Sequence, residues 1–500
     1  MARKSNTLPL SLPAPEPGLN LYRWLYEVIR KLILQGRLHP GDRLPASRDL
    51  ARAYEISRST VVAAYDQLKA EGYLMGWAGS ATRVASILPS HLATVRASVK
   101  PVRLPRSSAR LSDYALRLTP LRSARQRTVH AFRPNQPALD QFPTTLWAQV
   151  ASRRLRKVSA TLLAGGEALG YRPLREVVAS YLNTSRGVQC SPEQVLIVSG
   201  AQEGLDRTAR LFVDAGQSVW MEEPGYPGAA AVFRAAGAKI TAVKVDHDGM
   251  NVASGSREDR TARLVYVTPA HQFPTGVTMS LARRLELLQW ARVSQAIIFE
   301  DDYDSEYRYS GRPIPALQGM DRSGSVVFAG SFSAVLFPAL RLGYLVVPVD
   351  LVDRYAAAAS VSTHHPPLLE QAILCDFITE GHFARHIRRM RDLYAERLGI
   401  LLEAAKLRLE GLVEISEVEA GLQTMGWLRG RLGAEKISEL LRRRNVELVP
   451  MRRYAWGHAD SKAVVLGFAA VDPHEIKRGV EELARALETV RLKRESLQGD

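Results

Sequence analysis

From about residue 131 onward, short apolar runs alternate with helical stretches, and this pattern constrains the fold more than any other feature. The runs read VLIVSG, SVWMEEPG, ARLVYVTP, QAIIFEDDYD, SVVFAGSF and LGYLVVP. Strands buried on both faces show unbroken apolar runs, and their alternation with helices predicts a mostly parallel sheet covered on both sides. From about residue 365 we expect one long helix that leads into a smaller α+β part. The pattern thus predicts an α/β domain over 131–490, with a small α+β subdomain from about residue 400.

Residues 20–85 follow a different pattern, with three helical segments before a short hairpin. The first, LYRWLYEVIRKLILQG, places its apolar residues on one helical face, and a second short helix begins at Ser47. Ser57 is a suitable N-cap for a third helix that ends at Gly72. The stretch YLMGWAGSATRVAS then indicates two short strands around a glycine-rich turn. Three helices and a small hairpin predict a winged helix-turn-helix.

Basic charge is concentrated in the first quarter of the chain. Residues 1–130 hold 21 Lys and Arg against 8 Asp and Glu, a net charge of +13, whereas the remaining 370 residues hold 46 against 43. Such a concentration indicates a polyanionic partner, because Lys and Arg gain by releasing counterions from phosphate. Residues 86–130 carry nine of these basic residues and one acidic residue, and we interpret them as an extended linker. The linker either lies along DNA or is simply solvated.

The composition also limits where the protein works. No run of 18 or more apolar residues occurs, so we expect no membrane span, and the first residues lack a secretion signal. The two cysteines, Cys190 and Cys375, lie far apart and suggest neither a disulfide nor a metal site. We therefore expect a cytoplasmic protein with short tails at 1–19 and 491–500.

The segment RLHPGDRLPASRDLARAYEISRSTVVAAYDQLKAEGYL resembles the GntR-type winged helix, with the elements PGDRLP, SRSTV and EGYL in the family's order. The resemblance implies binding to double-stranded DNA. It places contacts at the starts of the second and third helices and at the wing tip, on residues Arg48, Ser57, Arg58, Ser59, Thr60, Gly79 and Ser80. Arg58 is the strongest candidate for a base or phosphate contact, since its planar fork suits either.

The large domain resembles the fold-type I aminotransferase domain of MocR-type regulators, a branch of the GntR group. The shared stretches include VSGAQEGLD, EEPGYPGA, YVTPAHQFPTGVTMSLARR, EDDYDSEYRYSGRP and EGHFARHIRRMR. The resemblance implies a site for pyridoxal phosphate (PLP). Its phosphate would meet Gly200, Ala201, Gln202, Ser331, Ser333 and Arg341. Its ring would stack on Tyr226, with Asp301 at the pyridine nitrogen and Tyr303 at the ring hydroxyl.

The sequence departs from the family's enzymes at four positions. PLP enzymes of this fold hold the cofactor through a lysine in an SFSK element, whereas this chain reads SFSA with Ala334 in that place. Gly165 replaces the tyrosine that a neighbouring subunit lends to the phosphate. Phe273 replaces the asparagine of NPTG, and Val465 lies where transaminases place an arginine for the substrate carboxylate. Ala334 offers no amine, so we predict that the chain is not an enzyme.

These features leave several hypotheses. The leading one is a DNA-binding transcription regulator whose large domain senses a small effector and forms a head-to-tail homodimer. That domain either binds PLP, pyridoxamine phosphate (PMP) or a preformed adduct with an amino compound non-covalently, or holds another ligand in the same cavity, or only dimerises. The alternatives are a PLP-dependent aminotransferase with an appended DNA-binding domain, and a nucleoid-type DNA binder without an effector.

Overall fold

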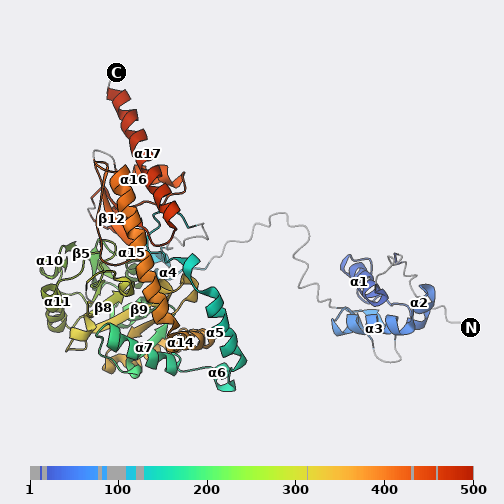
Figure 1. Ribbon diagram of the computed structural model, residues 1–500. Coiled ribbons are helices and arrows are strands. Elements are labelled where there is room, and N and C mark those ends of the chain that lie inside the picture. Colours follow the sequence, from blue (N-terminus) through green and yellow to red (C-terminus); the bar gives the residue numbers. More distant parts are fainter. Residues whose placement is uncertain are drawn as a thin grey trace, which may run out of the picture. The chain divides into compact units, whose positions relative to one another are not determined.

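The computed structural model describes residues 12–13, 20–76, 81–86, 109–119, 129–311, 314–429, 433–457 and 460–498, the last eight by backbone only. By internal contacts the chain divides into two compact units, Met1–Ala109 and Arg110–Asp500. Figure 1 draws both units, which we describe separately.

The first unit is a small helical domain with a two-stranded ribbon. It contains α1 (Leu21–Leu34), α2 (Ser47–Ala53), α3 (Arg58–Ala70), β1 (Leu74–Met75) and β2 (Arg83–Val84), and β1 pairs antiparallel with β2. One apolar cluster joins the elements, and its fully buried members include Leu25, Ile29, Val61 and Leu68. These residues lie about one helical turn apart on α1 and α3, so the amphipathic spacing gives the core. The winged helix-turn-helix prediction is confirmed.

The second unit is built on an eight-stranded sheet with the order β3-β10-β9-β8-β7-β4-β5-β6. The strands are β3 (Val195–Val198), β4 (Ser218–Glu223), β5 (Lys239–Asp246), β6 (Gly249–Met250), β7 (Leu264–Val267), β8 (Ile297–Asp302), β9 (Val326–Ser331) and β10 (Gly343–Val346). Six strands run in one direction, and only β10 and β6 run against their neighbours. The six apolar runs of the sequence are all strands of this sheet, so the mostly parallel α/β prediction is confirmed.

Helices cover both faces of this sheet (Figure 1). One face packs on α8 (Ala201–Phe212), α9 (Pro227–Ala236) and α13 (Val352–Ser360). The other packs on α10 (Val252–Glu258) and α11 (Leu281–Ser294) at one end, and on α7 (Arg172–Ser185), α14 (Leu368–Thr379) and α15 (His382–Arg408) at the other. Neighbouring residues of β4 divide between the faces: Met221 joins the first cluster and Trp220 the opposite one. The short helices α4 (Asp113–Arg117), α5 (Thr144–Arg156), α6 (Ala160–Ala164) and α12 (Phe332–Val335) complete this part.

The prediction of one long helix from about residue 365 is wrong in one respect, because this segment forms two helices. α14 (Leu368–Thr379) ends before Gly381, which has φ +75°, and α15 (His382–Arg408) begins directly after it. Glycine adopts this left-handed backbone without the steric penalty of a Cβ atom, so it ends one helix although the apolar pattern continues.

Beyond α15 the chain forms the smaller α+β part that the sequence predicted. Its antiparallel sheet has the order β11-β12-β14-β13, with β11 (Val413–Ile415), β12 (Gln423–Leu428), β13 (Val449–Pro450) and β14 (Ala463–Gly467). The helices α16 (Ala434–Arg442) and α17 (Pro473–Gln498) accompany it, and α15 packs along α17 (Figure 1). None of the helices among the described residues combines the length and the apolar character that crossing a membrane requires.

Candidate functional site

The predicted DNA-contacting residues gather around the start of α3 in the first unit. Ser57 is the N-cap of α3, and its hydroxyl oxygen accepts the Thr60 backbone N–H at 3.0 Å. The same oxygen lies 2.8 Å from the Ser59 hydroxyl and 2.7 Å from that of Thr60. This network fixes the first turn of α3 and directs small polar groups outward.

Two arginines complete this surface, Arg48 in the first turn of α2 and Arg58 as the first residue of α3. Both are exposed, and within the described residues neither guanidinium forms a hydrogen bond or ion pair. Their donors are therefore available to a phosphate or a base edge. The predicted wing-tip residues Gly79 and Ser80 lie outside the described residues.

In the second unit, all nine residues predicted for a cofactor line a single cavity of about 350 Å³. They come from separate elements. Gly200 follows β3, Tyr226 follows β4, Asp301 is the penultimate residue of β8, Ser331 ends β9, and Arg341 precedes the antiparallel β10. Since the carboxyl ends of parallel strands meet at one edge of a sheet, side chains far apart in sequence converge there.

Asp301 is the most informative residue of the cavity. Its Oδ2 accepts the hydroxyl of Tyr266 at 2.7 Å, while its Oδ1 is buried without a hydrogen-bond partner among the described residues. Burial raises the pKa of Asp301 to about 7, against the opposing effect of the Tyr266 hydrogen bond, and the nearby charges of Asp302 and Asp304 add to the rise. A buried carboxylate at a cavity wall, with one oxygen that has no partner among the described residues, is suited to accept a hydrogen bond from a ligand's ring N–H.

Aromatic side chains form the walls around Asp301. Phe273 meets the rings of Tyr226, Tyr303 and Tyr454 edge to face, with centroids 5.7, 5.8 and 5.1 Å apart. Burial raises the pKa of Tyr226 to about 12, so this tyrosine stays neutral. Phe273, which departs from the NPTG element, thus anchors an aromatic cluster that suits a flat ring.

Sequence reasoning missed a buried pair behind Tyr303. His271 Nδ1 lies 3.0 Å from both carboxylate oxygens of Asp304 and 3.1 Å from the Tyr303 hydroxyl. When the Nδ1 proton points at Asp304, the hydroxyl proton of Tyr303 stays available to the cavity. Tyr266 was also missed. It lies inside an apolar run, and only the pairing of β7 with β8 brings it beside Asp301.

The opposite end of the cavity is suited to a phosphate. Gly200 is the N-cap of α8, so the amides of Ala201 and Gln202 lie in the first helical turn, where backbone donors have no partner inside the helix. The Gln202 side chain donates from Nε2 to the Gly228 carbonyl at 2.9 Å, while its Oε1 is buried with no partner among the described residues. Arg341 is exposed and makes no side-chain hydrogen bond or ion pair with a described residue.

Two hydroxyls, from Ser331 and Ser333, line the same cavity beside Arg341. Ser333 donates weakly to the Leu342 carbonyl at 3.4 Å. The residues present therefore fit a phosphorylated pyridine, with a phosphate end, an aromatic wall and a carboxylate for the ring nitrogen.

Besides Phe273, three positions depart from the pattern of the family's enzymes. Ala334 lines the cavity, and no lysine is among the lining residues in the described part of the chain. Gly165 ends α6 with φ +120° and does not line the cavity. Val465 is fully buried in β14 within a small cluster with Met425 and Met451, away from the lining residues.

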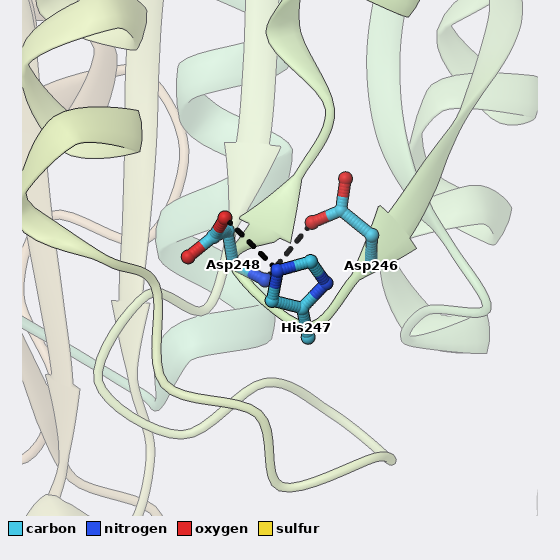
Figure 2. A group of neighbouring side chains, drawn as sticks. All are labelled: Asp246, His247 and Asp248. Carbon is cyan, nitrogen blue, oxygen red and sulfur yellow. Dashed lines mark hydrogen bonds and ion pairs between the residues drawn. The ribbon is translucent and has the colours of Figure 1, made fainter.

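One further polar group lies in the turn between β5 and β6. Figure 2 shows Asp246, His247 and Asp248, whose candidate ligand atoms lie within 4.8 Å of one another. The Asp246 carboxylate already accepts the Asp248 backbone N–H at 2.9 Å and pairs with Arg283 at 3.2 Å. These contacts explain the cluster as a stabilised turn, and we assign no metal to it.

The raised pKa of Asp301 predicts a pH-dependent stability. The folded state holds the proton more tightly than the unfolded chain, whose aspartate has a pKa near 3.8, so this residue's contribution to the free energy of unfolding falls from about pH 4 to pH 7 and is level above. We expect Asp301→Asn, measured by thermal unfolding without ligand, to gain stability relative to the original protein between pH 5 and pH 8, by about 3 kcal/mol at most. The exposed control Asp350→Asn should leave the pH profile unchanged, and parallel profiles for Asp301→Asn and the original would refute the assignment.

Comparison with known proteins agrees with this geometry. Residues 132–483 match the family model "Aminotransferase class I and II", and residues 21–84 match "Bacterial regulatory proteins, gntR family". The chain is 40% identical to the "Probable rhizopine catabolism regulatory protein MocR" of Rhizobium meliloti, with 93% of each protein covered. It is 31% identical to the "HTH-type transcriptional regulator TauR" of Rhodobacter capsulatus, over 95% of this chain and 98% of the relative.

Among solved structures, the chain is similar to LysN, the α-aminoadipate aminotransferase of Thermus thermophilus, in complex with N-(5'-phosphopyridoxyl)-L-leucine. The TM-score is 0.68 and the identity 27%, covering 76% of this chain and 98% of LysN. This likeness confirms the fold-type I aminotransferase architecture of the second unit.

Proposed function

We infer the function of this chain from the family to which it belongs, the MocR-type transcription regulators, in which a gntR-family DNA-binding domain precedes a domain of the aminotransferase class I and II family. We propose the division predicted from the sequence, with the winged helix at 20–85, the basic linker at 86–130 and the effector domain at 131–490. The DNA-binding unit binds promoter DNA, and the effector domain changes that binding when it takes up a small molecule.

DNA binding by Arg48, Ser57, Arg58, Ser59 and Thr60, with the wing residues Gly79 and Ser80, is part of this proposal. The guanidinium of Arg58, at the first residue of α3, supports it, since it is exposed and has no hydrogen-bond or ion-pair partner among the described residues, and the start of a recognition helix is the part that meets base edges. The hydroxyls fixed by the Ser57 cap add phosphate contacts.

The effector cavity is proposed to take a phosphopyridine, as PLP, PMP or an adduct with an amino compound. When bound, such a group supplies a ring that withdraws electrons from an attached amine. The buried Oδ1 of Asp301, which has no hydrogen-bond partner among the described residues, supports this choice more than any other observation, since it offers an acceptor for the ring N–H. Tyr303 would donate to the ring hydroxyl, Tyr226 would stack on the ring, and the amides of Ala201 and Gln202 with Ser331, Ser333 and Arg341 would hold the phosphate.

The same cavity is proposed to carry out no amino-group transfer. Ala334 has no amine to anchor the cofactor or to move a proton at the substrate carbon, and no lysine is among the cavity residues that the structure describes. Asp301 and Tyr303 can bind and orient a ligand, but neither replaces that amine. A different small ligand that occupies the cavity is the second candidate, since the aromatic wall would accept other flat molecules.

Occupancy is proposed to act through a head-to-tail homodimer, in which the effector shifts the spacing of the two DNA-binding units. A ligand changes such an equilibrium only by its differential affinity for the two arrangements.

The test combines two measurements on the full chain. Binding to DNA fragments selected from a random pool should change when PLP or PMP is added, and both compounds should raise the melting temperature without any transfer of amino groups to a keto acid. Measured amino-group transfer by the purified protein would favour the aminotransferase alternative. Equal binding to unrelated DNA with no effect of ligand would favour a nucleoid-type binder.

A further inference from the structure

A second cavity, of about 560 Å³, lies between α7, the segment after β8 and the long helix α15. It shares no lining residue with the cavity around Asp301. Its polar wall includes Tyr181, Arg186, Glu306, Arg308, Tyr309 and Arg388. The cavity is large enough for a small metabolite, and its lining residues come from three separate elements.

Five buried polar atoms of this wall have no partner among the described residues. They are Arg186 Nη2, Ser305 Oγ, Glu306 Oε2, Arg308 Nε and the Tyr309 hydroxyl. Arg186 and Glu306 are only 5% and 6% exposed. Buried polar groups almost always find a hydrogen-bond partner, so five unpartnered atoms around one cavity indicate that something polar fills it.

The charges of the wall favour an anion. Four arginines and two carboxylates, Glu306 and Asp392, line the cavity. Two further carboxylates outside the lining pair with two of the arginines, Asp302 with Arg186 at 2.9 Å and Glu419 with Arg308, yet Arg186 and Arg308 each keep one nitrogen with no partner among the described residues. The exposed Arg388 makes no side-chain hydrogen bond or ion pair with a described residue. Guanidinium groups match carboxylates through two parallel hydrogen bonds.

Among these donors lies one buried carboxylate, Glu306, since Asp392 is exposed. Glu306 Oε1 accepts the Tyr181 hydroxyl at 3.2 Å, while Oε2 has no hydrogen-bond partner among the described residues. A simple anion would satisfy the arginines and leave this oxygen unpaired. A ligand that fits the whole wall carries an acidic group together with a hydrogen-bond donor.

We propose that this cavity is a second ligand site, for a small amino or hydroxy acid whose carboxylate meets Arg186, Arg308 and Arg388 and whose amino or hydroxyl group donates to Glu306. The ligand also accepts a hydrogen bond from the Tyr309 hydroxyl. This site is separate from the proposed phosphopyridine cavity. The two are linked through neighbouring residues, because Arg186 of this site pairs with Asp302, which follows Asp301 in the chain.

Calorimetric titration of the full chain with L-aspartate, L-malate and succinate tests this site, since the three acids differ only in the donor group. We expect the first two to bind about ten-fold more tightly than succinate, because only they supply the hydrogen bond to Glu306. Inorganic phosphate serves as a fourth probe. Absence of heat with every acid up to about 10 mM, or binding of phosphate alone, would overturn the proposal. Equal affinity for succinate would overturn the role of Glu306.

Two variants localise the binding. Tyr309→Phe removes only a hydroxyl that has no partner among the described residues, so the fold should keep its melting temperature while L-aspartate affinity falls about five-fold. Arg388→Gln changes an exposed side chain and should lower the affinity about ten-fold. Arg408→Gln, at the exposed end of the same helix, is the matched control and should bind like the original protein. Unchanged affinity in both cavity variants would place the acid elsewhere and contradict the proposal. DNA binding is measured separately, so either result leaves the test of the regulator function intact.

Discussion

Ala334→Lys is expected to yield a chain that carries about one covalently bound phosphopyridoxyl group, which we expect the original protein not to take up. Ala334 lies in α12 and lines the cavity that Asp301 and Tyr226 also line. A lysine there brings an amine among groups suited to the ring and the phosphate. After incubation with PLP, borohydride reduction and dialysis, mass spectrometry should find the added group in the variant and not in the original protein.

Ala334→Met is the matched control for this experiment. Methionine has a similar length without an amine, so it separates the effect of filling the cavity from that of the reacting nitrogen. We also expect that only the lysine variant shows visible absorption that survives dialysis. Equal labelling of the original protein and the lysine variant would contradict the role of position 334, and an unlabelled lysine variant would contradict the phosphopyridine fit of the cavity.

Some of the fold could be predicted from the sequence because its signals are local. The six apolar runs are strands of the large sheet, and the spacing of apolar residues in α1 and α3 gave the first unit's core. β5 was not predicted, since it lies towards the edge of the sheet and its residues are mostly exposed or half-buried. The glycine at position 381 is a sequence signal for the end of a helix, but the apolar pattern continues on both sides of it and therefore favoured one long helix.

The residues of the candidate cofactor cavity also divide into those that could be predicted from the sequence and those that could not. Nine residues could be named because they lie in family elements, and the strand order brings them to one edge. The buried pair of His271 and Asp304 could not be found this way, because it depends on a loop after β7 folding back on the end of β8. The second cavity depends on α7 and α15, which are separated by about two hundred residues in the chain. Contacts of this kind come from tertiary packing, which residue spacing does not encode.

Arg58→Ala is expected to weaken binding to the selected DNA by about 1–3 kcal/mol, or about five- to 150-fold, while leaving the fold intact. Arg58 is exposed and its guanidinium forms no hydrogen bond or ion pair with a described residue, so its loss removes no polar interaction within the part of the chain that the structure describes. The first turn of α3 is held by the Ser57 cap, which the substitution does not touch. The affinity loss therefore reports a contact with DNA rather than a damaged helix.

A gel-shift titration at fixed salt measures this effect, and Arg23→Ala is the matched control. Arg23 lies on α1, is exposed and pairs with Glu27 at 3.0 Å, so both variants remove one positive charge from the same unit. If the loss came only from lower net charge, the two variants would weaken binding alike and with the same salt dependence. We expect Arg58→Ala alone to reduce the preference for selected over random DNA, because a base contact discriminates between sequences and a distant charge does not. An unchanged preference combined with a uniform loss of affinity would reassign Arg58 to phosphate.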